Sequence, residues 1–262
     1  MYIHERKRET IMKKILPFFP LLMVQLISAQ TMTGDKIIQK VNDVLNVESS
    51  YSKSEMTITT SSGKLRTFVS ESWSMKNGEK NLVRYISPRR VKDQAILMLN
   101  NADDIWAYFP RTQRVRKLAT HAKKQKMQGS DFSYEDMGSG DAFINDYTCK
   151  RLDDEEKNGQ DCYTLEMVKK PESDISYSRL VMWVVKDNFV PVAIQYFEED
   201  NPSRLKKELV SSDIRVIDGI PTAMEFVMYN RTDNTQTSMK ILDVHYNIEI
   251  SDSFFTERNL KK

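Results

Sequence analysis

The chain has 262 residues, of which 40% are hydrophobic, and its 39 Lys and Arg nearly balance its 37 Asp and Glu. A charge this close to neutral gives no indication of a nucleic-acid-binding protein. The length suits one domain with a substantial hydrophobic core.

The first segment has the pattern of a secretory signal peptide. Met12-Lys13-Lys14 precedes an apolar run interrupted by two prolines, and Ser28-Ala29 supplies the small residues of a cleavage site. The run is too short to predict a membrane-spanning helix. Residues 1–11 lie upstream of the complete signal, as a spurious extension would. We expect residues 1–29 to be removed by cleavage after Ala29. No lipid attachment is expected because no cysteine follows the run, and residues 30–262 should form a single soluble exported domain.

Helices are predicted at only a few places. Between residues 34 and 47, apolar side chains recur at helical spacing, so this segment predicts an amphipathic helix. Two shorter helices are expected, one near residues 119–127 and one after Ser130.

Most of the chain predicts short strands separated by tight turns. Asn77-Gly78, Asn158-Gly159 and Asp218-Gly219 are dipeptides that hairpins favour, because a two-residue turn needs positive φ angles. Consecutive hairpins predict a mainly β protein, an antiparallel meander that curls into an incomplete barrel and so limits exposed sheet edges. The expected strands cover residues 51–60, 64–75, 80–87, 94–100, 104–109, 114–118, 147–156, 161–168, 178–186, 190–198, 204–217, 222–230 and 236–247.

Alternation along these strands indicates which side chains face inward. Phe226 and Met228 lie on one face of the strand at 222–230, and Leu242 and Val244 repeat this period in the last strand. A strongly curved sheet with few helices leaves a concave apolar face that a ligand can fill. Methionine suits such an adaptable surface, although an ordinary core uses it too. We predict that such a cavity is lined by Met56, Ile58, Met98, Trp106, Leu165, Met167, Met182, Phe226 and Met228.

A basic stretch without acidic residues lies between Ile105 and Ser130, with aromatic segments on both sides. It predicts a surface that docks on an anionic membrane or an acidic partner protein, since each Lys or Arg near a charged bilayer contributes about 1 kcal/mol. A solvated loop that only keeps the protein soluble is the alternative. The docking residues would be Arg111, Arg114, Arg116, Lys117, Lys123, Lys124 and Lys126.

Two cysteines, Cys149 and Cys162, would lie in an oxidising compartment. A hairpin turn at Asn158-Gly159 places Cys162 opposite about Glu155. The two cysteines are then out of register for a bridge, which needs Cα atoms within about 7 Å. We expect separate thiols, with a disulfide as the alternative.

The sequence offers little for catalysis. Downstream of the signal there are two histidines, His121 and His245, and neither belongs to a cluster with the spacing of metal ligands. We expect His245 to face solvent or to be a satisfied structural residue. No enzyme activity, metal or cofactor is therefore expected.

The acidic residues after Gly129 have two interpretations. Asp131, Glu135 and Asp136 could form a metal site or an acid pair. A short helix capped by Ser130 or Asp131 explains the same acids, because carboxylates are favourable in the first turn of a helix. We favour the capped helix.

Several motifs together resemble a known bacterial family. They are Asp104-Ile-Trp-Ala-Tyr-Phe-Pro110, Arg114-Val-Arg-Lys-Leu118, the most specific block Gly129-Ser-Asp-Phe-Ser-Tyr-Glu-Asp136, and the weaker segments at 182–187, 218–221 and 254–260. In this combination, residues 30–262 resemble the outer membrane lipoprotein-sorting protein family. The resemblance implies the LolA/LolB/LppX-like fold, in which an incomplete antiparallel barrel closed by helices surrounds a hydrophobic cavity. It implies no catalytic residues.

These features predict a periplasmic carrier or chaperone that binds acyl chains of lipids or lipoproteins and hands them between the envelope membranes. Its expected partner is an inner-membrane transporter or an anionic membrane surface. No nucleic-acid partner is expected. The alternative is a regulatory or exporter-accessory module that senses lipidated ligands and docks on a membrane protein. A carrier needs a deep internal cavity, whereas a sensor can keep a shallow one.

Overall fold

The computed structural model describes residues 1–2, 32–45, 47–138 and 140–262. The predicted signal peptide and its cleavage site after Ala29 lie outside the described residues, apart from Met1 and Tyr2. The chain divides into one unit at 1–31 and a second at 32–262, and the fold below is that of the second unit. Among the described residues, no helix is long and apolar enough to cross a membrane.

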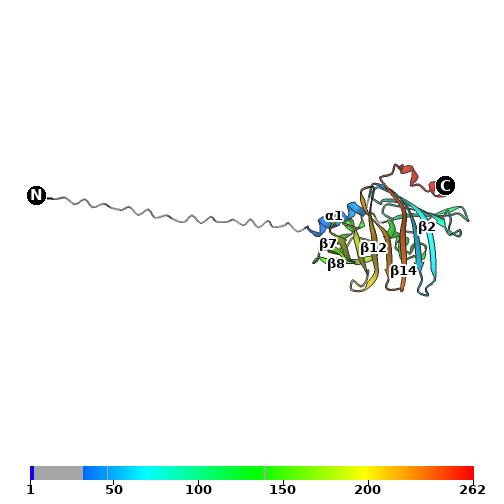
Figure 1. The fold of residues 1–262 in the computed structure, drawn as a ribbon. Helices are drawn as coiled ribbons and strands as arrows, with labels where there is room; N and C mark the ends of the chain where they lie inside the picture. The colour runs from blue at the N-terminus through cyan, green and yellow to red at the C-terminus, as the bar shows by residue number, and fades with distance from the viewer. Residues whose placement is uncertain (3–31, 46, 139) are drawn as a thin grey trace. The chain divides into compact units, whose positions relative to one another are not determined.

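The second unit is built on one curved antiparallel sheet of 14 strands, which confirms the predicted fold class (Figure 1). The strands run close to their predicted positions, and one predicted strand, 147–156, is two strands with a break between them. They are β1 (Ser49–Thr59), β2 (Leu65–Met75), β3 (Lys80–Ser87), β4 (Ala95–Leu99), β5 (Asp104–Phe109), β6 (Arg114–Lys117), β7 (Tyr147–Arg151), β8 (Glu155–Lys157), β9 (Gln160–Lys169), β10 (Tyr177–Val185), β11 (Pro191–Glu198), β12 (Leu205–Ile217), β13 (Ile220–Asn230) and β14 (Thr235–Tyr246).

The strand order shows how the sheet is assembled. It is β6-β5-β4-β3-β2-β1-β14-β13-β12-β11-β10-β9-β7, with β8 paired only to β9. The two ends of this order, β6 and β7, are consecutive strands in the sequence. Residues 118–146, named here the crossover segment, therefore connect one edge of the open sheet to the other.

The predicted hairpin turns form where the dipeptides indicated. Asn158 and Gly159 have φ values of 54° and 74° between β8 and β9, and Asp218 and Gly219 have 49° and 82° between β12 and β13. Positive φ at both central residues matches the right-handed twist of the flanking strands.

Helices cover the concave face of the sheet. α1 (Gly34–Leu45) ends two residues earlier than predicted and buries Ile37, Ile38 and Val41. The crossover segment contains η1 (Thr120–Lys124), η2 (Met127–Gly129), α2 (Tyr134–Gly138) and α3 (Ala142–Asn145). The helix expected near 119–127 is thus two 3₁₀ turns, and the one expected after Ser130 is α2.

The core lies on both faces of the sheet. On the concave face, one cluster joins Phe132 to the inward residues of β9–β11, and a second joins Met127 to those of β1–β5. On the outer face, η3 (Asp252–Phe254) and η4 (Asn259–Lys261) belong to a C-terminal segment that packs Phe255 and Leu260 against β3 and β4. The Arg84 side chain donates a hydrogen bond to the Asn259 carbonyl oxygen at 2.9 Å and fixes this segment.

Two side chains point away from their predicted face. Trp106 packs on the outer face with the C-terminal cluster, while its neighbours Ile105 and Ala107 are buried on the other side, so its predicted place in the cavity lining is wrong. Leu242 is 47% exposed, because the β1–β14 register shifts by one residue beside it. A one-residue shift moves a side chain to the opposite face.

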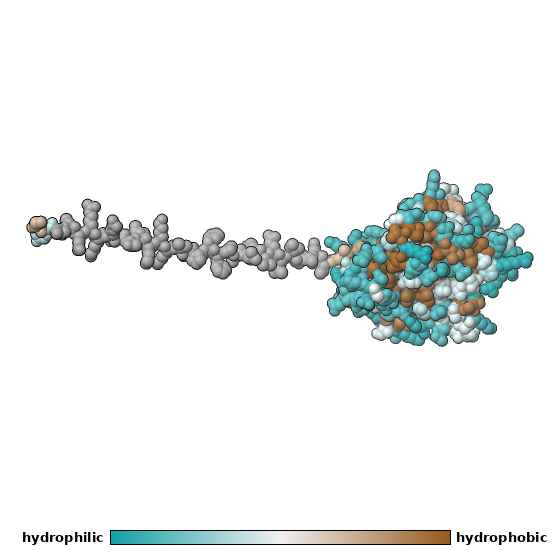
Figure 2. All heavy atoms as spheres, viewed as in Figure 1, coloured by the Kyte–Doolittle hydropathy of each residue, from teal (hydrophilic) through white to brown (hydrophobic). Residues whose placement is uncertain are grey.

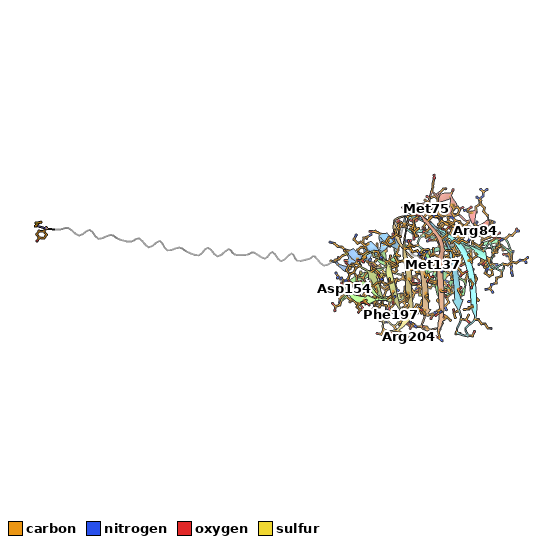
Figure 3. The ribbon with its side chains drawn as sticks, viewed as in Figure 1. Met75, Arg84, Met137, Asp154, Phe197 and Arg204 are labelled. Atoms are coloured by element: carbon orange, nitrogen blue, oxygen red, sulfur yellow. The ribbon has the colours of Figure 1, made fainter. Side chains whose placement is uncertain are left out.

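Hydrophobic residues also reach the surface. In the view of Figure 2, brown hydrophobic side chains gather over the middle of the domain and teal hydrophilic side chains surround them. Figure 3 labels Met137 of α2 in the central part of this view, at the position where the crossover segment lies against the sheet.

Candidate functional site

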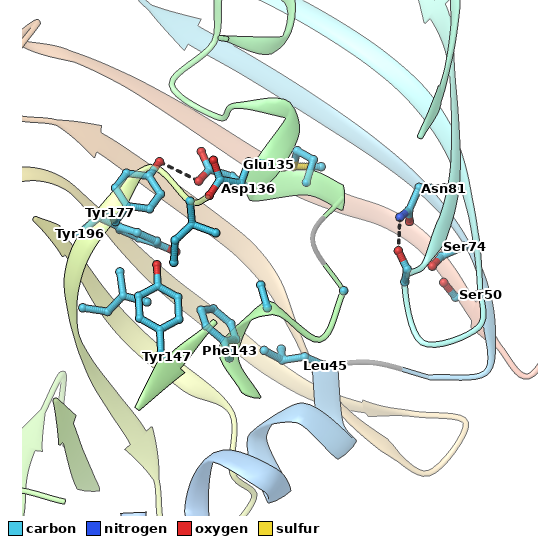
Figure 4. A pocket seen from close by; sticks show the side chains of 16 residues that line it. Leu45, Ser50, Ser74, Asn81, Glu135, Asp136, Phe143, Tyr147, Tyr177 and Tyr196 are labelled. Atoms are coloured by element: carbon cyan, nitrogen blue, oxygen red, sulfur yellow. Dashed lines mark hydrogen bonds between the residues drawn. The ribbon is translucent and has the colours of Figure 1, made fainter. Parts of the chain in front are cut away.

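A cavity lies between the concave face and the crossover segment (Figure 4). Its main lobe has a volume of about 330 Å³ and is lined from α1, β1, β2, the crossover segment, β7, β10 and β11. Two further lobes of about 200 Å³ each share Ser50 and Ser74 with the main lobe. The three lobes are named together the cavity.

One wall of the main lobe carries tyrosines and carboxylates. Tyr147, Tyr177 and Tyr196 come from three different strands, and Glu135 and Asp136 come from α2. Figure 4 shows the three rings on the side of the lobe where both carboxylates lie. Burial raises the pKa of all three tyrosines, so the hydroxyls remain protonated donors.

A buried ion pair ties α2 to the sheet. Lys207 Nζ lies 3.0 Å from Asp136 Oδ2, and the two side chains are only 6% and 5% exposed. The Tyr177 hydroxyl accepts from Lys207 at 2.9 Å and donates to Asp136 Oδ1 at 2.8 Å. All three polar groups are thereby satisfied, which a buried charge requires. We name this group of three residues the latch.

Glu135 makes a second link beside the latch. Its carboxylate accepts hydrogen bonds from the Ser176 backbone N–H, at 3.0 Å, and from the Ser176 hydroxyl. Burial raises the pKa of Glu135, and the two bonds from Ser176 act in the opposite direction. The loop before β10 is thus fastened to α2.

Asp131, between η2 and α2, fixes the crossover segment to β14. Its side chain is 2% exposed and accepts from the hydroxyls of Thr235, at 2.5 Å, and Thr237, at 2.8 Å. Asn230 also donates to it, at 3.3 Å. This residue is an anchor of the fold, so the expectation that it caps a helix is wrong.

Ser133 is the residue that caps α2. Its hydroxyl accepts from the Asp136 backbone N–H at 3.0 Å, and Asp136 Oδ2 accepts from the Ser133 N–H at 2.7 Å. This reciprocal arrangement is a capping box. Ser130, the other expected cap, instead donates to the Phe132 carbonyl oxygen. The motif at 129–136 is therefore a set of anchors that hold the cover of the cavity in place.

The predicted lipid-binding residues are brought together on the concave face, with the exception of Trp106. Only Met98 and Phe226 line a lobe of the cavity. The others are at most 4% exposed and pack in the two concave clusters against residues of the crossover segment, such as Met127 and Phe132. They are Met56, Ile58, Leu165, Met167, Met182 and Met228.

Much of the opposite wall is made of serines, which were not predicted as site residues. Ser50, Ser52 and Ser54 of β1 and Ser72 and Ser74 of β2 line one lobe together. The signal was available in the sequence, because serine occupies every second position from 50 to 54 and from 70 to 74. The prediction from sequence considered only the alternation of apolar residues and therefore missed these serines.

The basic stretch separates into two groups. Four of its lysines bind acids elsewhere in the fold: Lys117 to Asp104, Lys123 to Asp103 and Asp174, Lys124 to Asp174 and Glu199, and Lys126 to Asp233 and Asp131. Lys123 is only 12% exposed. Lys123, Lys124 and Lys126 thereby tie the crossover segment to other parts of the domain, and Lys117 pairs within the β5–β6 hairpin. That these lysines also dock on a partner stays a prediction.

Three arginines of the stretch remain exposed at the β5–β6 hairpin. Arg111, Arg114 and Arg116 make no ion pair with any described residue. The guanidinium of Arg116 lies 5.8 Å from the centre of the Phe109 ring. Positive charge at this edge of the sheet is therefore available to a partner.

The cysteines and histidines lie apart from one another. Cys149 and Cys162 are free thiols, and Cys162 pairs with Glu155 across the hairpin as predicted. Burial raises the pKa of Cys149 to about 12, which makes it unreactive. His245 faces solvent, 3.4 Å from Asp243. In the described part of the chain, no three His, Cys, Asp or Glu side chains gather in a way that could hold a metal ion.

Comparison with known proteins identifies the family. A family model with the description "Uncharacterized protein" matches residues 77–262. A DUF1329 family protein from Desulfovibrio piger is 28% identical, with a TM-score of 0.79 over 87% of this chain and 97% of that one. A domain named for outer membrane lipoprotein sorting, from Vibrio parahaemolyticus, is 25% identical, with a TM-score of 0.78 over 87% and 98%.

A third structure supports the fold alone. A LolA superfamily protein from Nitrosomonas europaea is 20% identical, with a TM-score of 0.72 over 87% of this chain and 99% of that one. Comparison with curated proteins gave no match. The resemblance drawn from the sequence motifs is confirmed: the chain belongs to the family whose model matches residues 77–262, and its fold is that of the LolA superfamily and the lipoprotein-sorting domains.

Proposed function

We propose that this protein is a periplasmic carrier or chaperone that holds acyl chains of lipids or lipoproteins in the cavity beneath the crossover segment. The observation that carries the proposal is a cavity, with a main lobe of about 330 Å³, between a curved sheet and the crossover segment. Pockets for small ligands commonly measure about 300–1,000 Å³. The likeness to the lipoprotein-sorting domain supports the same ligand class.

Loading would involve the crossover segment. This segment places Met127, Phe132 and Met137 against the concave clusters, where they occupy the space next to the predicted lipid-binding side chains. An acyl chain that replaced them would bury its own methylenes, each worth about 0.8 kcal/mol. We therefore expect the crossover segment to move outward when a long acyl chain enters, while the 14 strands stay paired.

The same proposal assigns binding rather than catalysis to the protein. Of the described residues that line the cavity, none is a histidine or a cysteine, and its serines lack a neighbouring general base. A nucleophilic serine requires such a base within hydrogen-bond reach. A ligand held there would be released unchanged.

Docking is proposed for the three exposed arginines, Arg111, Arg114 and Arg116, with an anionic membrane surface or a membrane transporter as the partner. Replacing all three with Gln should weaken binding to anionic vesicles by up to about 3 kcal/mol at low salt, from about 1 kcal/mol for each charge. The matched control replaces Lys123 and Lys124, which should lower stability because both bind acids. Vesicle binding that is insensitive to the arginines and to salt contradicts the docking proposal.

The carrier proposal is tested by Phe226→Glu, with Phe226→Leu as the matched control. Phe226 lines one lobe and is only half-buried, so a carboxylate there should be tolerated by the fold but should oppose an adjacent acyl chain. The measurements are melting temperature, lipid retained after purification by native mass spectrometry, and uptake of a panel of lipids with pyrene-labelled chains. Wild-type protein that retains and takes up no lipid, or a folded Phe226→Glu variant with its full lipid content, refutes the proposal.

A further inference from the structure

Six serines form a ladder on the concave face. They occupy alternate positions of β1 and β2, and the antiparallel register places them directly opposite one another in three pairs. The pairs are Ser50 with Ser74, Ser52 with Ser72, and Ser54 with Ser70.

The inner pair and the outer pairs of the ladder differ. Ser54 and Ser70 are buried and lie within 3.4 Å of each other, hydroxyl to hydroxyl. The other four hydroxyls line the cavity and have no hydrogen-bond partner among the described residues. Farther along the same faces, Met56 and Ile58 of β1 and Phe68 of β2 are apolar and buried. The concave face is therefore polar at one end of these strands and apolar at the other.

A second set of free hydroxyls faces the cavity from the other wall. Tyr147 and Tyr196 are only 6% and 7% exposed, and both line the main lobe. Neither hydroxyl has a hydrogen-bond partner within the described chain, and Figure 4 shows both rings directed into the lobe. Both hydroxyls are open to the cavity, so a polar group of a ligand could form hydrogen bonds with them.

The charges of the lining restrict the ligand. No Lys or Arg is among the described residues that line the three lobes, whereas Glu135 and Asp136 are. The nearby Lys207 is already bound by Asp136 and Tyr177 in the latch. A phosphate or a free carboxylate would therefore enter without a counter-ion and next to two acids, which is unfavourable in a buried site.

We infer that the cavity selects uncharged lipids, and that the serine ladder and the two tyrosines bind the hydroxyl and ester oxygens of a neutral acylglycerol. This inference rests on the proposed function and names its ligand class. The glycerol end lies at the serine end of β1 and β2, and the acyl chains run toward Met56 and Phe68.

The test compares two lipids with identical chains, dipalmitoylglycerol and dipalmitoyl phosphatidic acid, by competition against a pyrene-labelled lipid. Wild-type protein should bind the neutral lipid at least about tenfold more tightly. Replacing Ser50, Ser52, Ser72 and Ser74 with Ala should weaken its binding about tenfold, which corresponds to about 1.4 kcal/mol, and should reduce the preference. The matched control replaces four exposed serines, Ser61, Ser62, Ser203 and Ser212, and should change neither value.

A second variant tests the same inference in case the serine variant does not fold. Tyr147→Phe with Tyr196→Phe removes two free hydroxyls and keeps both rings, and it should also lower affinity for dipalmitoylglycerol. Equal or tighter binding of phosphatidic acid, or folded variants that retain the wild-type preference, overturns this inference and leaves the carrier proposal standing. Absence of binding to any lipid overturns both.

Discussion

Breaking the latch should loosen the cover of the cavity. Asp136→Asn preserves the shape of the side chain but leaves Lys207 without the carboxylate 3.0 Å away, in a position that is 6% exposed. Removing one partner of a buried pair costs about 3–5 kcal/mol, because the remaining charge stays buried and uncompensated. For a domain of this size, about 2–4 °C per kcal/mol converts that loss into a melting temperature lower by roughly 6–20 °C.

The matched control is Glu225→Gln, the same change from acid to amide in an exposed pair. Glu225 and Lys240 lie 3.1 Å apart but are 43% and 59% exposed. Such pairs contribute about 0.2–1 kcal/mol, so the control should unfold almost as the wild type does.

Two measurements compare Asp136→Asn with the control Glu225→Gln. Urea unfolding gives the free energy of unfolding, and amide hydrogen exchange shows whether protection is lost first in the crossover segment, where Asp136 lies. A loss below about 1 kcal/mol for Asp136→Asn, as expected only of an exposed pair, would refute the assignment of the latch. So would a loss of protection spread evenly over all strands.

Three other predictions follow from single groups. Burial raises the pKa of Glu135, so its neutral carboxyl is compatible with folding at low pH and stability is lost as the pH rises through the raised pKa, where the buried group ionises. Glu135→Gln should therefore gain stability relative to wild type between about pH 4 and pH 7, and thermal melts that stay parallel would contradict this. Cys149 and Cys162 are free, so a reductant should leave the melting temperature unchanged, and a large fall would reveal a bridge. N-terminal sequencing of exported protein should begin at Gln30, and a retained or acylated upstream segment would refute the processing prediction.

The sequence predicted the strands well because two local signals agree along them. Dipeptides such as Asn158-Gly159 mark the turns, and alternation marks the face of each strand between them. In a meander nearly every strand pairs with its neighbour in sequence, so the positions of the strands largely predict their order in the sheet.

Side-chain placement failed where non-local structure decides it. The short strand β5 is apolar on both faces, so alternation could not show that the C-terminal segment covers Trp106. The lysines at 123, 124 and 126 looked free because their partners, such as Asp174 and Glu199, are far away in sequence. Of the latch, the sequence indicated only Asp136, as an acid near a helix start, because its partner Lys207 comes from the distant strand β12.

The strand order also has a consequence for folding. The chain consists of two successive meanders, β1–β6 and β7–β14, whose strand pairs are all local except for the seam between β1 and β14. At that seam the Ser49 hydroxyl donates to the Ile248 carbonyl oxygen at 2.7 Å, between residues 199 positions apart. Because contacts over such distances require the largest loop closure, each meander can form before the seam does. The cavity is bounded by strands of both meanders, so it exists only after the seam has closed, and a nascent chain has no binding site for lipid until β14 has been made.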